Sequence, residues 1–394
     1  MKYSYFVFIY IFVILSSKSI ENQVLEIPLQ TIAVKGIPKY REIEFEESSD
    51  DDNSDLDFIL LTNDGKAFYN LNRLFLASLT IGSNNQPFNL LLDTGSDIVW
   101  VAKKGSYDIS PITHHYNPSS STTSKFTGRA FEKKYGSGSC SGDLYIDKFT
   151  YSNNRFSCLF GAAMKTNFNV YQGDGICGLA RVYNEENLSF IHALKNGKVT
   201  NSLAFSLKFY LQNSQIIGKM ILGKDQDFSK SGIATCPLIT TSNIPAKRWA
   251  CTLNSFGLKN SKAEQTFNVG KAVMFDTGTN NLILPLSVFT QLKNRLKKFN
   301  CGYSASSDGS SYKIVCNSDL PNFTLNFNGY TFTIPSKISY HKSNNNIFAN
   351  IIFTDKTSMP IIGSPFFVAF HTLFDHNSKV MTFYPSYGTI KKTN

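Results

Sequence analysis

The chain has 394 residues, 42% of them hydrophobic, and a formal net charge of +10. A chain of this length can bury two sizeable hydrophobic cores, and its composition excludes a disordered protein. Residues 1–61 carry 5 Lys or Arg against 11 Asp or Glu, so the rest holds 34 basic side chains against 18 acidic ones. The basic residues are scattered and accompany no recognition motif, which argues against nucleic-acid binding and leaves a basic surface-binding module supported by charge alone.

Residues 1–19 have the pattern of a secretory signal peptide. Lys2 precedes an apolar core, Tyr5–Leu15, and small residues follow. This core is shorter than the roughly 20 residues that span a bilayer, so we expect a mature protein without a stable membrane anchor. The expected location is extracellular, a secretory vesicle, or an acidic lysosome- or vacuole-like compartment. Asn187 and Asn322 begin glycosylation sequons, which agree with this route.

Residues 20–61 contain the acidic run EESSDDDNSDLD. Such a run stays solvated and cannot pack as a core. Because it lies between a signal peptide and a globular body, we interpret 20–61 as a pro-segment, and the alternative is an N-terminal linker. An acidic segment on a basic body suggests an electrostatic latch, which would weaken at low pH as the carboxylates take up protons.

From residue 62 onward, short apolar strands alternate with turn residues. Alternating hydrophobicity and β-branched or aromatic side chains dominate these strands. Helical patterns are few, and the best are Asn187–Lys195 and Pro285–Phe299. We therefore expect a mostly-β protein with two similar lobes, residues 62–228 and 229–394.

One motif occurs twice in the chain. Phe88–Val101 reads FNLLLDTGSDIVWV and Ala272–Pro285 reads AVMFDTGTNNLILP, so in both an Asp-Thr-Gly turn lies between two apolar strands. A buried carboxylate costs several kcal/mol unless it is compensated, so its placement between core strands indicates a use. Each copy also has a later partner of two apolar residues and a glycine, Ile176–Gly178 and Ile361–Gly363. The repetition indicates two related halves that each supply one carboxylate.

The seven cysteines are an odd number, so at least one thiol is unpaired. Cys301 and Cys316 bracket a polar, Gly- and Ser-rich loop, and we expect them to form a disulfide. Cys177 lies in an apolar run and is expected to be a buried free thiol. No pair has the CxxC spacing of a zinc site, so no metal is expected. Two further pairs have strand–turn–strand spacing and could also form disulfides, Cys140 with Cys158 and Cys236 with Cys251.

The doubled motif and its neighbours resemble the pepsin-like aspartic proteases. The resemblance covers nearly the whole chain, and its motifs follow the family's order. They are FLASLTIG, DTGSDIVWV, KKYGSGSCSG, GDGICGLA, AVMFDTGTNN and PIIGSPFFVAFHTLFDHNSKVMTFYP. The resemblance implies a bilobal fold of two similar β lobes, an active-site cleft between them, and a flap formed by KKYGSGSCSG in the N-terminal lobe.

The resemblance implies an aspartic endopeptidase that is made as a zymogen and cuts proteins or peptides with Asp93 and Asp276. Two carboxylates held close together cannot both ionise and therefore share a proton, a behaviour for which aspartic proteases are the standard example and which we adopt from them. The charged member acts as general base on a water, and the protonated member hydrogen-bonds the scissile carbonyl. No metal and no cofactor is expected, and the protein is expected to be a monomer.

Six residues beside the pair are implied to support it: Thr94, Gly95, Ser96, Thr277, Gly278 and Thr279. The glycines let the backbone turn tightly, so that its N–H groups reach the carboxylates. By family likeness, the threonine after each aspartate braces the two loops. The hydroxyl three positions after each aspartate donates to an outer carboxylate oxygen.

The flap is implied to comprise Tyr135, Gly136, Ser137 and Gly138. A glycine-rich hairpin tip can close over a substrate and exclude water, and by family likeness Tyr135 bonds toward Trp100. Apolar residues around the cleft imply a preference for apolar side chains beside the cut. The expected pocket walls are Phe168, Ile176, Met274 and Ile361.

Two residues near the cleft depart from the family's usual pattern. Lys134 precedes the flap tyrosine, either as a cation that favours acidic substrate residues and ionised aspartates or as a solvated flap-edge lysine. Asp97 adds a further carboxylate near the pair. The alternative function is a catalytically silent binding or inhibitor protein on the same fold, which would be expected to lack one aspartate or the flap tyrosine. In the pro-segment, Lys39 and Tyr40 resemble the lysine–tyrosine pair of family zymogens.

Overall fold

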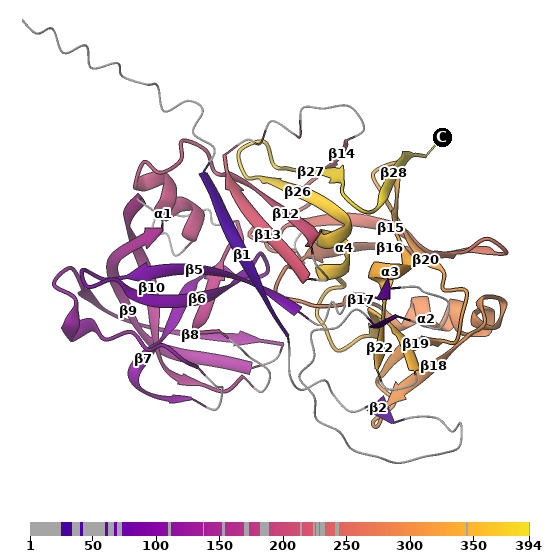
Figure 1. Ribbon diagram of the computed structural model, residues 1–394, viewed down its shortest axis with the longest axis horizontal. Helices are drawn as coiled ribbons and strands as arrows, with labels where there is room; N and C mark the ends of the chain where they lie inside the picture. The colour runs from indigo at the N-terminus through magenta and orange to yellow at the C-terminus, as the bar shows by residue number, and fades with distance from the viewer. Residues whose placement is uncertain are drawn as a thin grey trace, which may run out of the picture.

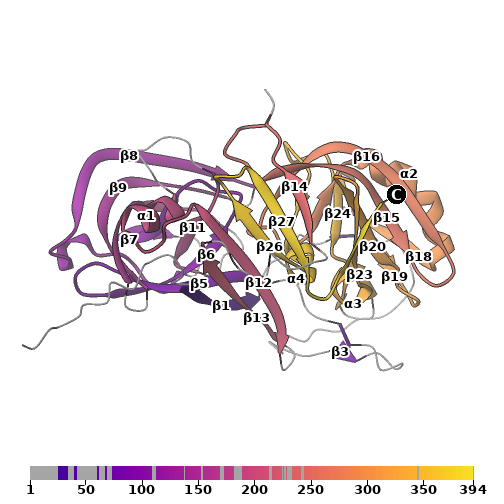
Figure 2. The ribbon, with the colours of Figure 1, turned by 90° about the horizontal axis from the view of Figure 1, so that it is seen from above.

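The computed structural model describes the backbone of residues 25–33, 40–41, 60–61 and 67–68, and of residues 73–393 with short gaps. The gaps are 109–111, 137, 152–153, 169–172, 182–188, 213–214, 224, 226–227, 229–232, 241–243 and 344–345. The predicted signal peptide, the acidic run of the predicted pro-segment, Ser137 and Asn187 lie outside the described residues. The described residues form two β-rich lobes that lie side by side, one coloured indigo to magenta and one orange to yellow (Figures 1 and 2).

The N-terminal lobe is organised by the first sheet, which has thirteen strands among the described residues. In spatial order they are β14 (Ala234–Pro237), β27 (Val380–Pro385), β26 (Phe370–Asp375), β12 (Ala204–Gln212), β13 (Gln215–Leu222), β1 (Leu25–Ala33), β5 (Arg73–Ile81), β6 (Gln86–Asp93), β11 (Gly175–Gly178), β7 (Val99–Asp108), β10 (Asn154–Thr166), β9 (Gly138–Tyr151) and β8 (Lys125–Tyr135). Leu90 and Leu92 of β6 face the main core and Leu91 faces a second apolar cluster, so both faces of this strand are buried.

The C-terminal lobe is organised by the second sheet. Its path runs through β2 (Tyr40–Arg41), β18 (Cys301–Ser306), β19 (Ser311–Cys316), β24 (Ile351–Thr354), β17 (Leu282–Leu284), β25 (Ile361–Ile362), β16 (Glu264–Phe275), β15 (Ala250–Lys259), β20 (Asn322–Phe327), β21 (Tyr330–Ile334) and β28 (Thr389–Lys392). β22 (Tyr340–Ser343) and β23 (Asn346–Ala349) attach at β19, and β3 (Leu60–Leu61) pairs separately with β4 (Ala67–Phe68). The mostly-β, bilobal prediction is confirmed, whereas the expected division at residues 228/229 stays a prediction.

The two lobes share backbone hydrogen bonds. β26 and β27, close to the C-terminus, extend the first sheet beside β12, with Phe205 opposite Phe374 (Figure 1). β1, from the predicted pro-segment, pairs with β13 on one side and β5 on the other. The chain thus returns to its N-terminal half after building the C-terminal lobe, and this return holds the lobes together.

The helices are short and few among the described residues. The pattern at Pro285–Phe299 becomes α2 (Leu286–Leu292) and a 3₁₀ turn, η4 (Lys293–Phe299), and the pattern at 187–195 becomes α1 (Phe190–Asn196). α4 (Ser364–Ala369), whose side chains are all buried, lies within the C-terminal motif PIIGSPFFVAFHTLFDHNSKVMTFYP. The other short elements are α3 (Ser336–Ser339) and η2 (Pro118–Ser120). No described helix is long and apolar enough to cross a membrane.

Aromatic packing around the end of β16 supports the second Asp-Thr-Gly turn. Phe275, at the end of β16, is fully buried and makes ring contacts with Phe327, Phe366 and Phe383, whose centroids lie 5.3 to 5.5 Å away. A fully buried phenylalanine side chain contributes about 1.5–3 kcal/mol relative to an exposed one. Because Asp276 is the next residue, this packing also fixes the position at which that carboxylate emerges.

The expected disulfide is present. Cys301 and Cys316 are directly opposite in the β18–β19 hairpin and are bonded. Cys177 is a buried free thiol, as expected, and burial raises its pKa.

The two further pairs whose spacing allowed a disulfide are not bonded in the structure, where all four cysteines are free. Cys140 is opposite Thr166 and Cys158 is opposite Asp147 in the β9–β10 pair, so the register separates the two cysteines by seven positions of β9 and eight of β10. Cys236 and Cys251 are buried neighbours but belong to strands of different sheets, and the Cys251 thiol hydrogen-bonds the Pro237 carbonyl at 3.7 Å.

Candidate active site

The two Asp-Thr-Gly turns have equivalent strand surroundings. Asp93 ends β6, and β11 runs parallel to β6 and antiparallel to β7. Asp276 follows β16, and β25 runs parallel to β16 and antiparallel to β17. The later partners predicted from the sequence, Ile176–Gly178 and Ile361–Gly363, are therefore the strands that hold each turn in place.

Hydrogen bonds between Thr94 and Thr277 join the two turns. Each backbone N–H donates to the other residue's Oγ1 at 3.1 Å. Each hydroxyl then donates to a carbonyl of the opposite strand, Thr94 to Phe275 at 2.8 Å and Thr277 to Leu92 at 2.7 Å. Both side chains are 0% exposed, so these four bonds form without competition from water. They hold the two turns face to face across the lobe boundary.

The glycines bring the two carboxylates close together. Gly95 N–H donates to Asp93 Oδ1 and Gly278 N–H donates to Asp276 Oδ1, both at 2.8 Å. A Cβ atom added at Gly95 would lie 2.8 Å from the Asp276 carboxyl group, and one at Gly278 would lie 2.9 Å from that of Asp93. Each glycine therefore leaves the space in which the opposite aspartate sits.

The environment of Asp93 favours its protonated form. Asp93 and Asp276 are only 5% and 8% exposed. Burial, followed by the charge of Asp276 and a hydrogen bond with it, raises the pKa of Asp93 well above its ordinary value, while the Ser96 hydroxyl and the Gly95 N–H act in the opposite direction. A buried carboxyl group beside a second carboxylate therefore tends to hold its proton.

The outer oxygens of the two aspartates differ in their partners. Thr279 Oγ1 donates to Asp276 Oδ2 at 2.8 Å. The equivalent hydroxyl of Ser96 is buried, and no described residue lies in good hydrogen-bond geometry with it. In the described geometry Asp276 thus accepts hydrogen bonds from the Gly278 N–H and the Thr279 hydroxyl, and Asp93 accepts one from the Gly95 N–H.

The predicted flap is the hairpin of β8 and β9, and Tyr135 ends β8. Trp100 Nε1 donates to the Tyr135 hydroxyl at 3.1 Å. The Phe168 ring lies 5.4 Å from that of Tyr135 and 5.6 Å from that of Trp100. A Cβ at Gly138 would lie 2.9 Å from the Phe168 side chain, so this glycine allows the flap to approach the cluster. Burial raises the pKa of Tyr135, so its hydroxyl stays neutral and can donate.

Lys134 and Asp97, the two departures from the family pattern, lie in different environments. The Lys134 side chain is 82% exposed and lies 3.8 Å from the carboxylate of Glu132, which is itself 65% exposed, so it is a solvated flap-edge lysine. Asp97 is paired with Lys133 of β8 at 3.0 Å and with Lys247 at 2.9 Å. Burial opposes the charge of Asp97, but the bonds from Lys247 and Lys133 hold its pKa below the ordinary value.

The four expected pocket walls are buried. Ile176, Met274 and Ile361 lie in strands, and Phe168 follows the end of β10. Phe168 and Ile176 belong to the apolar cluster that contains Trp100 and contacts Tyr135. Met274 and Ile361 are neighbours in the matching part of the C-terminal lobe, where β16 pairs with β25. Their roles as substrate pockets stay predictions, as does glycosylation of Asn322, whose Oδ1 accepts a hydrogen bond from the Ser336 N–H at 2.8 Å.

Sequence reasoning missed a basic segment, residues 244–249, that precedes β15. Arg248 Nη1 donates to the carbonyl of Gly95, and Trp249 Nε1 donates to that of Leu179 at 2.9 Å. Lys247 adds the ion pair with Asp97. Two adjacent cations just before a strand were the only signal in the sequence, and nothing local indicated that they would meet the turn that bears Asp93.

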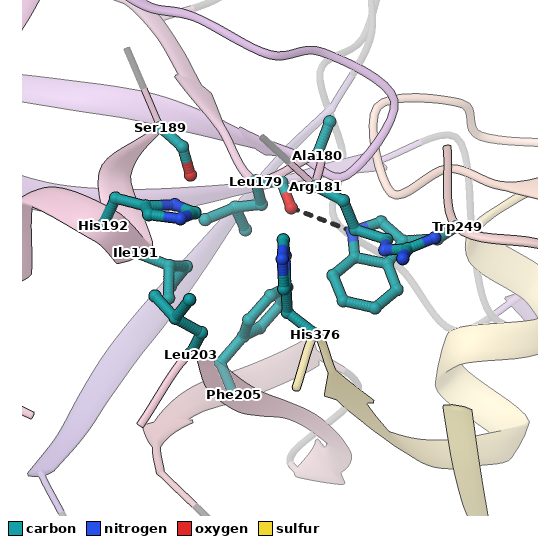
Figure 3. A pocket seen from close by; sticks show the side chains of 10 residues that line it. All are labelled: Leu179, Ala180, Arg181, Ser189, Ile191, His192, Leu203, Phe205, Trp249 and His376. Atoms are coloured by element: carbon teal, nitrogen blue, oxygen red, sulfur yellow. Dashed lines mark hydrogen bonds between the residues drawn. The ribbon is translucent and has the colours of Figure 1, made fainter. Parts of the chain in front are cut away.

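A small cavity lies behind the first turn (Figure 3). It measures about 10 Å³, and its lining includes Arg181, His192, Trp249 and His376. This volume holds at most one water molecule, so the cavity is too small for a substrate. Its wall at Leu179 belongs to the backbone that bonds the carbonyl of Asp93 at 2.8 Å, so the cavity belongs to the scaffold of the turn.

The chain can be assigned to a family on these grounds and by comparison. Residues 74–385 match the family model of the eukaryotic aspartyl proteases, and the chain belongs to that family, which places it among the aspartic-type endopeptidases. Among the described residues, no group of three or more His, Cys, Asp or Glu side chains is arranged to hold a metal ion.

Similar proteins include gastricsin of Oryctolagus cuniculus, 26% identical over 77% of this chain and 79% of that protein. Vacuolar protease A of Neurospora crassa is 27% identical over 77% of this chain and 76% of its own length. Pepsin A of Gallus gallus is 27% identical over 78% of this chain and 83% of its own length.

Proposed function

We propose that this chain is an active aspartic endopeptidase whose catalytic pair is Asp93 and Asp276. The observation that carries the proposal is the geometry of the two turns, in which Gly95 and Gly278 each hold one carboxylate beside the other. Both aspartates, both supporting threonines and the flap tyrosine are present together, which argues against a silent binding protein on this fold.

The arrangement supports a mechanism without a covalent intermediate. The ionised carboxylate, assigned to Asp276, takes a proton from a water molecule that attacks the scissile carbonyl carbon. Asp93, which holds the shared proton, donates a hydrogen bond to the carbonyl oxygen and stabilises the developing negative charge. Proton transfer to the amide nitrogen then lets the C–N bond break, which regenerates the pair with one proton.

The flap supports a preference for apolar residues beside the cut. Tyr135, Trp100 and Phe168 form one aromatic cluster, in which the Phe168 ring lies within 6 Å of both other rings and Trp100 donates a hydrogen bond to the Tyr135 hydroxyl. Closure of the hairpin would place Tyr135, backed by this cluster, over the substrate and exclude water from the reacting bond.

We further propose that the protein is made as a secreted or vacuolar zymogen. The signal-like residues 1–19, the acidic segment and the names of the relatives support this route. β1, within the proposed pro-segment, pairs with two strands of the body, so residues 25–33 form a structural part of the precursor.

Peptide cleavage by the acid-treated full-length chain tests the function. We expect cleavage between apolar residues at acidic pH, inhibition by a pepstatin-type compound, and loss of at least about 10³-fold in rate for Asp93→Ala and Asp276→Ala. The matched control is Asp319→Ala, which removes a half-exposed carboxylate of the C-terminal lobe that pairs with Lys262. Cleavage that resists the inhibitor and survives both substitutions would overturn the proposal.

A further inference from the structure

The segment that precedes β15 places a guanidinium beside the proposed catalytic pair. Arg248 Nη1 donates to the carbonyl oxygen of Gly95. Gly95 itself lies between the carboxylates, because its N–H bonds Asp93 and its Cβ position faces Asp276 at 2.8 Å. The guanidinium is therefore about one peptide unit from the reacting centre.

Several contacts hold Arg248 in this place. Trp249, which follows it, is fully buried and donates to the Leu179 carbonyl at 2.9 Å. The carbonyl of Lys247, which precedes it, accepts the N–H of Arg181 at 2.9 Å. With the backbone fixed on both sides, the Arg248 side chain has a defined origin and can move only about its own torsions.

The charges around the first turn do not balance. Asp97 is shared by Lys133 and Lys247, so one carboxylate faces two ammonium groups. Among the described residues, the hydrogen-bond partner of the Arg248 guanidinium is the neutral carbonyl of Gly95, and no carboxylate pairs with it. These three cations face the charge of Asp97 and the single negative charge of the catalytic pair, so one positive charge stays uncompensated at this edge of the site. A guanidinium also has five donors, of which most are unused here.

We propose that Arg248, with Lys247 and Lys133 beside it, forms a subsite for an acidic side chain of the substrate. A guanidinium binds a carboxylate through two parallel, charge-assisted hydrogen bonds, which are stronger than a bond to a neutral carbonyl. Binding of an aspartate or glutamate side chain would draw Arg248 off Gly95, whose carbonyl could then accept an N–H of the substrate backbone.

The short distance between Arg248 and the catalytic pair limits where the acidic residue can lie in the substrate. An extended peptide advances about 3.3 Å per residue, so a carboxylate that meets Arg248 comes from a residue within about two positions of the cut bond. The inference rests on the proposed function and narrows its substrates to peptides with apolar residues at the cut and an acidic residue close by.

The test uses matched peptides with a common apolar cut site. Each carries Glu, Gln or Lys at one of the two positions on either side, and kcat/KM is measured with the acid-treated full-length chain at pH 5, where a free Glu is ionised. We expect one position at which Glu exceeds Gln by about tenfold and Lys is the poorest.

Substitutions at Arg248 test whether this side chain causes the preference for Glu. Arg248→Met should abolish the preference, so that the ratio of kcat/KM between the Glu and Gln peptides falls to about one, and Arg248→Lys should keep part of the preference because the charge remains without the planar fork. The matched control is Arg295→Met, an exposed arginine of η4 in the other lobe, which should leave the preference unchanged.

A binding measurement separates this inference from the proposed function. The same peptides, fluorescently labelled, are titrated against the Asp93→Asn variant, which needs no turnover. Tighter binding of Glu than Gln peptides without any cleavage by the unmodified chain would support the subsite and refute the proposed activity. Equal values for Glu and Gln at every position, in cleavage or in binding, would overturn the subsite, as would a preference that survives in Arg248→Met.

Discussion

Thr94 and Thr277 lie 183 residues apart, and each donates its backbone N–H to the hydroxyl of the other. Neither half of the chain can satisfy these groups by itself, because each hydroxyl bonds a carbonyl of the opposite strand. The two turns are therefore complete only when the lobes are together, and the site and the lobe interface form one structure.

The first prediction concerns this brace. Thr94→Val keeps the shape of the side chain but leaves the Thr277 N–H and the Phe275 carbonyl buried without their partner. Each such group costs about 1–3 kcal/mol, so we expect a loss of about 2–4 kcal/mol in the free energy of unfolding, measured by urea titration. Thr389→Val, at an exposed position of β28, is the control. Equal unfolding midpoints for the two variants would contradict the role of the brace.

The second prediction concerns the space between the carboxylates. Gly95→Ala and Gly278→Ala would each place a methyl group within 2.9 Å of the opposite aspartate. The carboxylates must separate to make room, and a misplacement of about 1 Å costs about 10²-fold in rate. Peptide cleavage by both variants should fall by at least that factor. Gly302→Ala, at which an added Cβ meets nothing within 4 Å, should keep full activity, and similar losses in all three variants would argue against a local effect.

The third prediction contrasts two neighbouring aspartates. The pKa of Asp93 is raised by burial and by Asp276, so the stability that its protonated form contributes is present at low pH and is lost as pH rises through the folded-state value. The pKa of Asp97 is lowered by Lys247 and Lys133, so its contribution is present above the ordinary value and is lost as pH falls through the lowered one.

The two asparagine variants should therefore change stability in opposite directions at neutral pH. Asp93→Asn should raise the free energy of unfolding at pH 7 and change it little at pH 3, whereas Asp97→Asn should lower it at pH 7, with a difference that shrinks on acidification. Urea titrations of the full-length chain at pH 3, 5 and 7 measure both. Shifts of the same sign in the two variants at pH 7 would refute this account of their environments.

The fourth prediction concerns the Cys301–Cys316 bond, which closes a loop with a sequence separation of 15. In the chain-entropy model a loop of this size stabilises a protein by about 3 kcal/mol. The Cys301→Ser, Cys316→Ser double variant should lose about that amount in urea unfolding and should respond no further to a reducing agent. Cys140→Ser, which removes a free thiol, should retain the sensitivity of the unmodified chain to reduction. A reducing agent without effect on the unmodified chain would show that the bond is dispensable.

Local sequence patterns determined much of this fold. Alternating and continuous apolar runs located the strands around Leu92, and the doubled Asp-Thr-Gly motif indicated two related halves. The pattern at Pro285–Phe299 located α2 and η4. Cys301 and Cys316 were predictable because a hairpin of nearby strands places them opposite each other. In each case the residues that interact are close in sequence, or the motif is repeated.

The features of this protein that depend on strand register and on contacts between distant residues were determined only by the tertiary structure. Cys140 and Cys158 have suitable spacing, but the register of β9 against β10 keeps them apart. Asp97 looked like an extra acid at the site, and two lysines from other segments make it an ion-pair partner. Arg248 had no local signal, because its contact with Gly95 spans 153 residues and forms only when the lobes close on each other. Such contacts depend on the summed packing of both lobes, which no local window of the sequence contains.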